Sequence, residues 1–172
     1  MTQPDHSFDR TSELHVLFVC SGNTCRSPLA EILAVVAAKE LGIPDVTVRS
    51  SGTSTVSGFP PSEGARRAAQ RHGLSLEAHT SSPISSDLVA WADIVLVMGP
   101  FHLHRVRELG GDGKGHLLMA FAEEREGEGA DGNDLAISDP FGGDDGVYED
   151  TYQALKRLVF RALERLRKEA GE

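Results

Sequence analysis

A short apolar run that is followed, after one loop, by the start of a helix is the feature that most constrains how this chain can fold. Residues 14–19 are apolar apart from His15, which is typical of a strand buried on both faces. Ser27 and Pro28 follow closely and predict an N-cap and a first helical residue. Apolar residues then recur at helical spacing until Gly42, where we expect the helix to end.

The same alternation of strand and helix continues along the chain. Further strands are predicted over 46–51 and 92–98 and, from a weaker pattern, over 117–121. Further helices are predicted over 60–72, 86–91, 100–109 and 148–169. Strands that alternate with helices imply right-handed crossovers, so we expect an α/β fold with a parallel sheet. Ligands of such folds bind at the carboxyl ends of the strands, which directs attention to the loop after Val19.

Length and local composition predict the domain organisation. The chain has 172 residues, which fits one domain. Residues 1–12 are polar and unpatterned and are expected to form a loose tail, with the domain spanning 13–172. Within that domain, residues 123–136 (EEREGEGADGNDLA) are acidic and rich in glycine, and they predict a mobile loop.

Charge and cysteine content exclude several classes of protein. Lys plus Arg number 17 and Asp plus Glu number 26, a net charge of −9 that argues against binding to nucleic acid or anionic membranes. The apolar runs are too short to span a bilayer, and the amino terminus lacks the pattern of a secretory signal. Two cysteines are too few for a disulfide scaffold or a four-cysteine zinc site. We therefore expect a cytoplasmic protein. We also expect a monomer, because no contiguous apolar surface can be deduced from the sequence.

The loop after the first strand has the chemistry of an oxyanion site. It reads Cys20-Ser21-Gly22-Asn23-Thr24-Cys25-Arg26-Ser27. Unsatisfied N–H groups at the helix start point into such a loop, and the helix dipole adds about half a positive charge. Gly22 permits close backbone approach, Asn23 tolerates left-handed angles, and Arg26 can bind a tetrahedral oxyanion through two N–H groups of its forked guanidinium. The loop is therefore suited to phosphate, arsenate or sulfate.

Cys20 begins this loop and is the candidate nucleophile. The helix dipole, the loop N–H groups and Arg26 would stabilise its thiolate, and Ser27 is placed to hydrogen-bond the sulfur. We therefore expect a lowered pKa and a reactive thiolate at neutral pH. The alternative interpretation, a small buried cysteine beside an ordinary helix start, does not use Arg26 and Gly22.

Asp139 is the candidate proton donor. Phosphoryl transfer to a cysteine needs a proton for the leaving group, and Asp139 precedes Pro140, which fixes the backbone after it. Partial burial and anionic surroundings would raise the pKa of its carboxyl as a general acid requires. Phe141 would form a wall of the pocket. A simple turn at Asp-Pro is the alternative.

Several segments together resemble one known family. Residues 16–31 read VLFVCSGNTCRSPLAE, and this stretch resembles the signature of the low-molecular-weight protein tyrosine phosphatases. The segments 50–53, 92–98 and 139–141 resemble further segments of that family in the same order. The resemblance spans about residues 14–168 and leaves out the tail and the acidic loop.

The resemblance implies a fold, a reaction and a set of site residues. It implies a flavodoxin-like three-layer fold, with a four-stranded parallel sheet between helices. It also implies a metal-independent phosphatase that acts on phosphorylated proteins through a cysteinyl-phosphate intermediate. Cys20 would be the nucleophile, Arg26 the phosphate clamp, and Asp139 first the acid and then the base. Asn23 and Ser27 would support the loop and the thiolate. The phosphate-binding loop would be completed by Ser21, Gly22, Thr24 and Cys25.

Two positions bear on the substrate. Tyrosine-specific members usually have a branched apolar residue where this chain has Thr24, whereas the bacterial protein arginine phosphatases of the family have threonine. A threonine hydroxyl can accept a hydrogen bond from a guanidinium N–H group. Phe141 is followed by two glycines, which also resembles the arginine-specific branch. We therefore expect a protein-arginine phosphatase, with a tyrosine phosphatase as the alternative if Thr24 has no effect on specificity.

Two other classes of function remain to be weighed. Thioredoxin-coupled arsenate reductases share this fold but use further downstream cysteines, and none follows Cys25 here. A non-catalytic phosphate-binding or redox module would need a defect in the catalytic set, and none is visible. Cys20 and Cys25 could form a protective disulfide on oxidation, or Cys25 could be a small buried residue. His102 and His104 alternate on a predicted helix and cannot share a face, which argues against metal binding.

Overall fold

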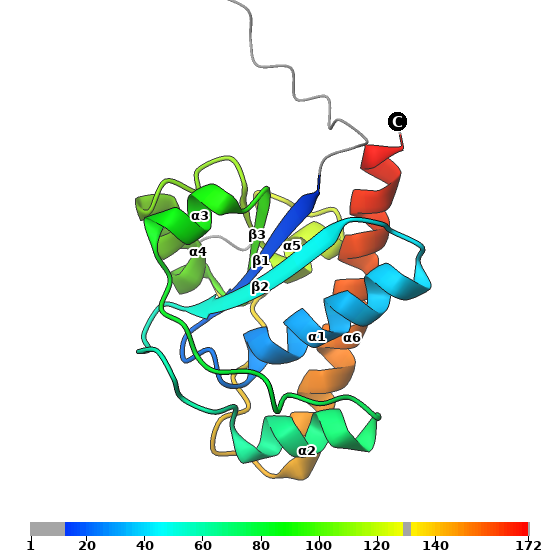
Figure 1. Ribbon diagram of the computed structural model, residues 1–172. Coiled ribbons are helices and arrows are strands. Elements are labelled where there is room, and N and C mark those ends of the chain that lie inside the picture. Colours follow the sequence, from blue (N-terminus) through cyan, green and yellow to red (C-terminus); the bar gives the residue numbers. More distant parts are fainter. Residues whose placement is uncertain (1–12, 129–131, 172) are drawn as a thin grey trace, which may run out of the picture.

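A four-stranded parallel sheet forms the centre of the computed structural model, which describes residues 13–128 and 132–171. The strands are β1 (Leu14–Cys20), β2 (Val46–Gly52), β3 (Ile94–Val97) and β4 (Gly115–Leu117), in the order β2-β1-β3-β4 (Figure 1). In the central β1, Phe18 pairs with Ser50 on one side and with Leu96 on the other. Cys20 is the last residue of β1 and pairs with Gly52, so it lies at the carboxyl edge of the sheet.

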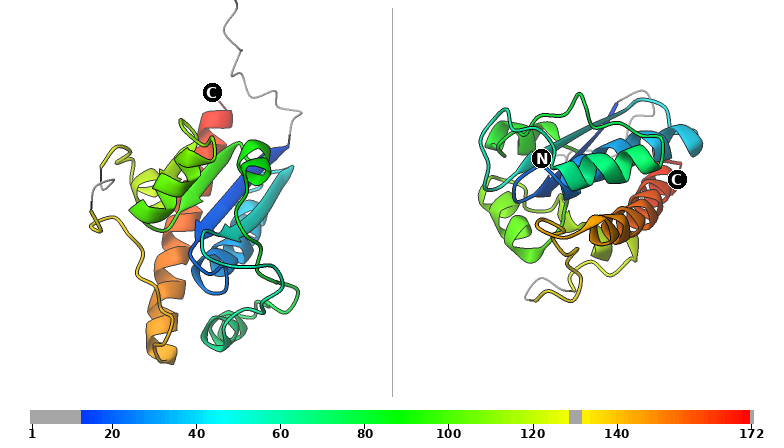
Figure 2. Two further views of the ribbon diagram at one scale, coloured as in Figure 1. Left: turned by 90° about the vertical axis from the view of Figure 1, so that its left-hand side faces the viewer. Right: turned by 90° about the horizontal axis from the view of Figure 1, so that it is seen from below.

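Helices cover both faces of this sheet. Those of the described residues are α1 (Arg26–Glu40), α2 (Glu63–Arg71), α3 (Ser86–Trp91), α4 (Pro100–Glu108), α5 (Leu118–Ala122) and α6 (Asp145–Ala170). Figures 1 and 2 show α1 and α6 side by side on one face, with α3 and α4 on the other. The predicted flavodoxin-like three-layer fold is therefore confirmed.

The residues of β1 alternate between the two faces. Val16 and Phe18 pack in one apolar cluster with residues of α1 and α6, whereas Leu17 and Val19 pack in a second with residues of α3 and α4. All four side chains are fully buried, and burial of such a side chain contributes about 1.5–3 kcal/mol. Burial on both faces explains why this strand reads as a continuous apolar run rather than as an alternating one.

The predicted strand over 117–121 is wrong. Strand β4 ends at Leu117, and the chain turns into the short helix α5 at Leu118. Leu118 and Phe121 are both buried in the cluster under α1 and α6, while Leu117 belongs to the opposite cluster. A short apolar run does not distinguish a strand from a buried helical turn, and the three-residue spacing of Leu118 and Phe121 suits one helical face.

Two helices begin earlier than the sequence predicts. Helix α6 begins at Asp145 because the carboxylate of Asp144 caps its first turn. Helix α1 begins at Arg26, and Cys25 occupies its N-cap position without a capping side-chain hydrogen bond. The predicted N-cap at Ser27 is therefore wrong, because the Ser27 hydroxyl is bonded within the loop before the helix.

Some expectations fall on segments that the structure describes only partly. The expected tail, residues 1–12, lies outside the described residues. Of the expected loop 123–136, the described parts 123–128 and 132–136 contain turns and bends but neither helix nor strand. Among the described helices, none is both long and apolar enough to span a membrane.

Candidate active site

The loop of residues 21–25 joins β1 to α1 at the carboxyl edge of the sheet, where the sequence predicts a ligand site. The end of β2 packs directly against it, and the Ser54 N–H donates to the Ser21 carbonyl over 3.0 Å. A Cβ atom at Gly52 would lie 2.5 Å from that carbonyl oxygen. Glycine at position 52 is therefore required for this close approach.

Backbone N–H groups of the loop are available for an anion. Among the described residues, no acceptor pairs with the N–H groups of Gly22, Thr24 or Cys25. Asn23 has a φ of 55°, the left-handed conformation that lets successive N–H groups curve around a common centre. The N-terminus of α1 follows immediately at Arg26. The loop therefore has the geometry of a binding site for a tetrahedral oxyanion.

Asn23 is fully buried and fixes this loop from within. Its amide nitrogen donates to Ser27 Oγ over 2.8 Å and to Ser50 Oγ over 3.0 Å. Its amide oxygen accepts from the Ser82 N–H over 2.9 Å, and its carbonyl accepts from His79 Nε2 over 2.7 Å. These contacts hold the strained backbone of Asn23 in place. Ser50, Ser82 and His79 are not predicted from the sequence, because they lie far from Asn23 along the chain.

The sulfur of Cys20 lies beneath the loop and is 2% exposed, counted over the whole residue. Cys20 Sγ is 2.9 Å from Ser27 Oγ and accepts a hydrogen bond from the Asn23 N–H over 3.3 Å. Burial raises the pKa of the Cys20 thiol, while the contacts with Ser27, the charge of Arg26 and the Asn23 N–H oppose that rise. The expected lowering of this pKa is therefore wrong in sign, because the sulfur is almost completely enclosed.

Arg26 and Asp139 meet across the site, although 113 positions separate them in the sequence. The Arg26 side chain is buried, donates to the Ile137 carbonyl over 2.8 Å and lies 3.6 Å from Asp139 Oδ2. Its Nε is buried and has no partner among the described residues, so a donor remains available for a ligand. The Asp139 carboxylate is half-exposed and accepts from the Phe141 N–H over 3.1 Å.

Thr24 and Phe141 are the residues that bear on the choice of substrate, and both are at least partly exposed. Thr24 is half-buried, and its Oγ1 lies 3.5 Å from the position that a Cβ atom at Gly22 would take. The Phe141 side chain belongs to a residue that is 74% exposed. Both are therefore open to a substrate, and the wall that Phe141 is expected to form stays a prediction.

Cys25 is held away from solvent by two neighbouring elements. It is buried, with Sγ 3.0 Å from Ser62 Oγ at the start of α2 and 3.6 Å from Tyr148 Oη on α6. Cys20 and Cys25 are both free thiols in this structure. Their pairing on oxidation stays a prediction.

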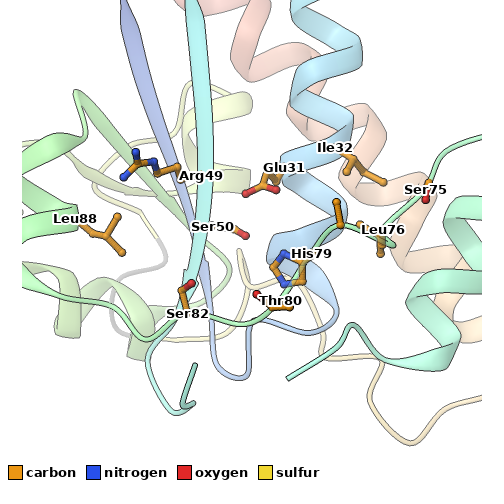
Figure 3. A pocket seen from close by; sticks show the side chains of 11 residues that line it. Glu31, Ile32, Arg49, Ser50, Ser75, Leu76, His79, Thr80, Ser82 and Leu88 are labelled. Carbon is orange, nitrogen blue, oxygen red and sulfur yellow. The ribbon is translucent and has the colours of Figure 1, made fainter. Parts of the chain in front are cut away.

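A separate cavity of about 460 Å³ lies between β2, α1 and the chain segment 75–82 (Figure 3). Figure 3 shows Glu31, Ser50 and His79 converging in it, and burial raises the pKa of the Glu31 carboxyl. Cys20 does not line this cavity. The cavity therefore adjoins the supports of the Cys20 loop, Ser50 and His79. It is distinct from the predicted site of Cys20, Arg26 and Asp139, none of which lines it.

The described residues contain no group of three or more His, Cys, Asp and Glu side chains placed to hold a metal ion. This part of the sheet edge holds a buried sulfur, unpaired loop N–H groups and a buried guanidinium that lies 3.6 Å from a half-exposed carboxylate. Such a set can bind an oxyanion, supply a nucleophile and move a proton.

Several known phosphatases are similar to this chain in sequence. The protein-arginine-phosphatase of Geobacillus stearothermophilus is 35% identical over 154 residues, which cover 90% of this chain and 97% of the relative. That of Bacillus subtilis (strain 168) is 32% identical over 156 residues, covering 91% and 99%. The low molecular weight protein-tyrosine-phosphatase Etp of Escherichia coli (strain K12) is 29% identical over 144 residues, covering 83% and 87%.

Solved structures of an arginine phosphatase and a tyrosine phosphatase are also similar to this chain. A YwlE arginine phosphatase variant with a phosphorylated active-site serine superposes with a TM-score of 0.81 at 30% identity, covering 90% of this chain and 97% of that one. The tyrosine phosphatase Wzb from Escherichia coli K30, in complex with sulphate, has a TM-score of 0.74 at 28% identity, covering 88% and 97%. Residues 15–171 match the model described as "Low molecular weight phosphotyrosine protein phosphatase", and the chain belongs to that family.

Proposed function

We propose that this phosphatase acts on phosphoarginine in proteins and forms a phosphorylated Cys20 as its intermediate. Thr24 carries the choice of substrate, because its side chain is only partly buried in the phosphate-binding loop and its hydroxyl can accept from a guanidinium N–H group. The two protein-arginine-phosphatases that are 35% and 32% identical to this chain over most of its length support that choice. A cytoplasmic location and a monomeric state stay predictions from the sequence.

In the first step, the Cys20 thiolate attacks phosphorus while the phosphorus–nitrogen bond to arginine breaks. The electron pair of that bond goes to the guanidine nitrogen, which takes the proton of the Asp139 carboxylic acid. Burial raises the pKa of Cys20, and the contacts of Ser27 and the Asn23 N–H with the sulfur, together with the charge of Arg26, oppose that rise and favour the thiolate. Arg26 and the unpaired loop N–H groups bind the phosphoryl oxygens, on which negative charge is carried through the transition state.

In the second step, the Asp139 carboxylate takes a proton from water, and the water oxygen attacks phosphorus. The sulfur–phosphorus bond breaks, and its electron pair returns to Cys20 as a thiolate while inorganic phosphate leaves. The half-exposed position of Asp139 supports this role, because the carboxylate can contact both the leaving group and water.

Replacing Thr24 by isoleucine is expected to move the preference from phosphoarginine toward phosphotyrosine. The change removes an acceptor for a guanidinium N–H group, which contributes about 1 kcal/mol, and it adds an apolar surface for a phenyl ring. The ratio of kcat/KM for the two substrates should therefore fall by about tenfold or more. The measurement is kcat/KM of both proteins on a phosphoarginine protein and a matched phosphotyrosine peptide.

A Thr24→Ser variant is the matched control, because it keeps the hydroxyl and should keep the preference. An unchanged substrate ratio in Thr24→Ile would contradict the role of Thr24. A wild-type preference for phosphotyrosine would instead favour the tyrosine phosphatase alternative, for which the 29% identity to Etp is the supporting observation.

A further inference from the structure

His102 lies in the first turn of α4 and is almost fully buried, with 4% of the residue exposed. Its Nε2 is 2.8 Å from the hydroxyl of Ser21, the first loop residue after Cys20. The end of β3 brings α4 to this position, because the Met98 N–H donates to the Val19 carbonyl over 3.1 Å. A buried imidazole therefore reaches the phosphate-binding loop from outside it.

The imidazole of His102 is uncharged at neutral pH. Burial, and then the charge of Arg26, lower its pKa to about 4, while the Asp139 carboxylate acts weakly in the opposite direction. Its Nδ1 is buried and has no partner within the described part of the chain. A buried nitrogen lone pair without a partner costs less free energy than a buried N–H group without one. The single proton of the neutral ring is therefore assigned to Nε2, which has a partner. His102 therefore donates to Ser21 Oγ.

Ser21 connects this contact to the phosphoryl group. The carbonyl of Ser21 and the N–H of Gly22 belong to one planar trans peptide and point in opposite directions. That carbonyl accepts from the Ser54 N–H over 3.0 Å, whereas the Gly22 N–H is one of the unpaired loop donors. Ser54 therefore holds this peptide directly through its carbonyl, whereas His102 holds Ser21, the residue before the peptide bond, through its side chain.

We propose that His102 is a positioning residue of the phosphatase reaction, which holds the Ser21–Gly22 peptide so that the Gly22 N–H points at the phosphoryl oxygens. The proposal rests on the proposed function only in that a phosphoryl group must enter the loop. It applies equally to phosphoarginine and phosphotyrosine, because both present the same oxygens to the loop. A misplaced donor in such a site can cost up to about 100-fold in rate.

A double-mutant cycle with Ser21→Ala and His102→Leu tests the contact. Each single variant is expected to lower kcat/KM about tenfold and to raise the inhibition constant of inorganic phosphate, because the loop donor is no longer held. The double variant should lose no more than either single variant, since both remove the same contact. His102→Gln, whose amide nitrogen can donate in place of Nε2, should retain most of the activity.

His104→Leu is the matched control on the same helix, because its side chain is 77% exposed and should not affect either constant. Thermal unfolding of every variant shows whether His102→Leu folds. If His102→Leu does not fold, the Ser21→Ala variant alone tests the contact, because Ser21 is only partly buried. Unchanged kinetics of Ser21→Ala, or losses that multiply in the double variant, would overturn the proposal. If phosphotyrosine proves to be the substrate, the double-mutant cycle is measured with phosphotyrosine. Failure of the proposed substrate can then be distinguished from failure of the proposed role of His102.

Discussion

Replacing Cys20 by serine is expected to abolish turnover of phosphoarginine and phosphotyrosine substrates alike. A serine hydroxyl is a weak nucleophile without a neighbouring base, and here the nearest side-chain partner of Cys20 Sγ is the Ser27 hydroxyl, which is no base. We expect kcat to fall by about 10⁴-fold or more, as for the loss of other enzyme nucleophiles. The measurement is the rate of phosphate release under saturating substrate.

Phosphate binding provides the control for this variant. The loop N–H groups and Arg26 remain, so inorganic phosphate should raise the Tm of Cys20→Ser as it raises that of the wild type. Turnover within tenfold of the wild-type rate would contradict the role of Cys20 as the nucleophile. Loss of phosphate binding would show instead that the variant disturbs the loop.

Replacing Asp139 by asparagine is expected to lower kcat for a phosphoarginine protein by about 10²–10⁴-fold, the range for loss of a general acid. The effect depends on the leaving group, because the basic guanidine needs a proton whereas p-nitrophenolate leaves without one. The first step with p-nitrophenyl phosphate should therefore be much less affected. The burst of p-nitrophenolate in a rapid-mixing experiment measures that step directly.

Asparagine keeps the size of Asp139 and an oxygen for the Phe141 N–H, which limits other changes. Asp134→Asn is a matched control, since Asp134 is an exposed carboxylate of the same segment and should not affect either rate. Equal losses with both leaving groups would argue that Asp139 acts by holding Arg26, 3.6 Å away, and not as the acid.

The core of the site could be predicted because its chemistry is compact in the sequence. Cys20, Asn23 and Arg26 lie within seven consecutive residues between a buried strand and a helix, and that context defines a phosphate-binding loop. Asp139 is predicted from the proline that follows it and from the need of the leaving group for a proton. The structure brings it to Arg26, although its role as the acid stays a prediction.

The supports of the loop could not be predicted, because they come from distant segments. His79 and Ser50 bond Asn23 from the segment 75–82 and from β2, and no local pattern distinguishes them from ordinary polar residues. The sequence pattern around His102 and His104 bears only on metal binding, whereas in the fold His102 contacts the loop through Ser21. The rise in the pKa of Cys20 could not be predicted either, because it comes from burial of the sulfur by segments that are distant in the sequence.

The most direct test of the account compares kcat/KM of the wild-type protein on a phosphoarginine protein and on a matched phosphotyrosine peptide, with Cys20→Ser beside it. The account predicts that phosphoarginine is preferred by at least tenfold and that Cys20→Ser releases phosphate from neither substrate. A preference for phosphotyrosine would keep the mechanism but contradict the proposed substrate. Turnover of neither by the wild type would contradict the proposed function as a whole.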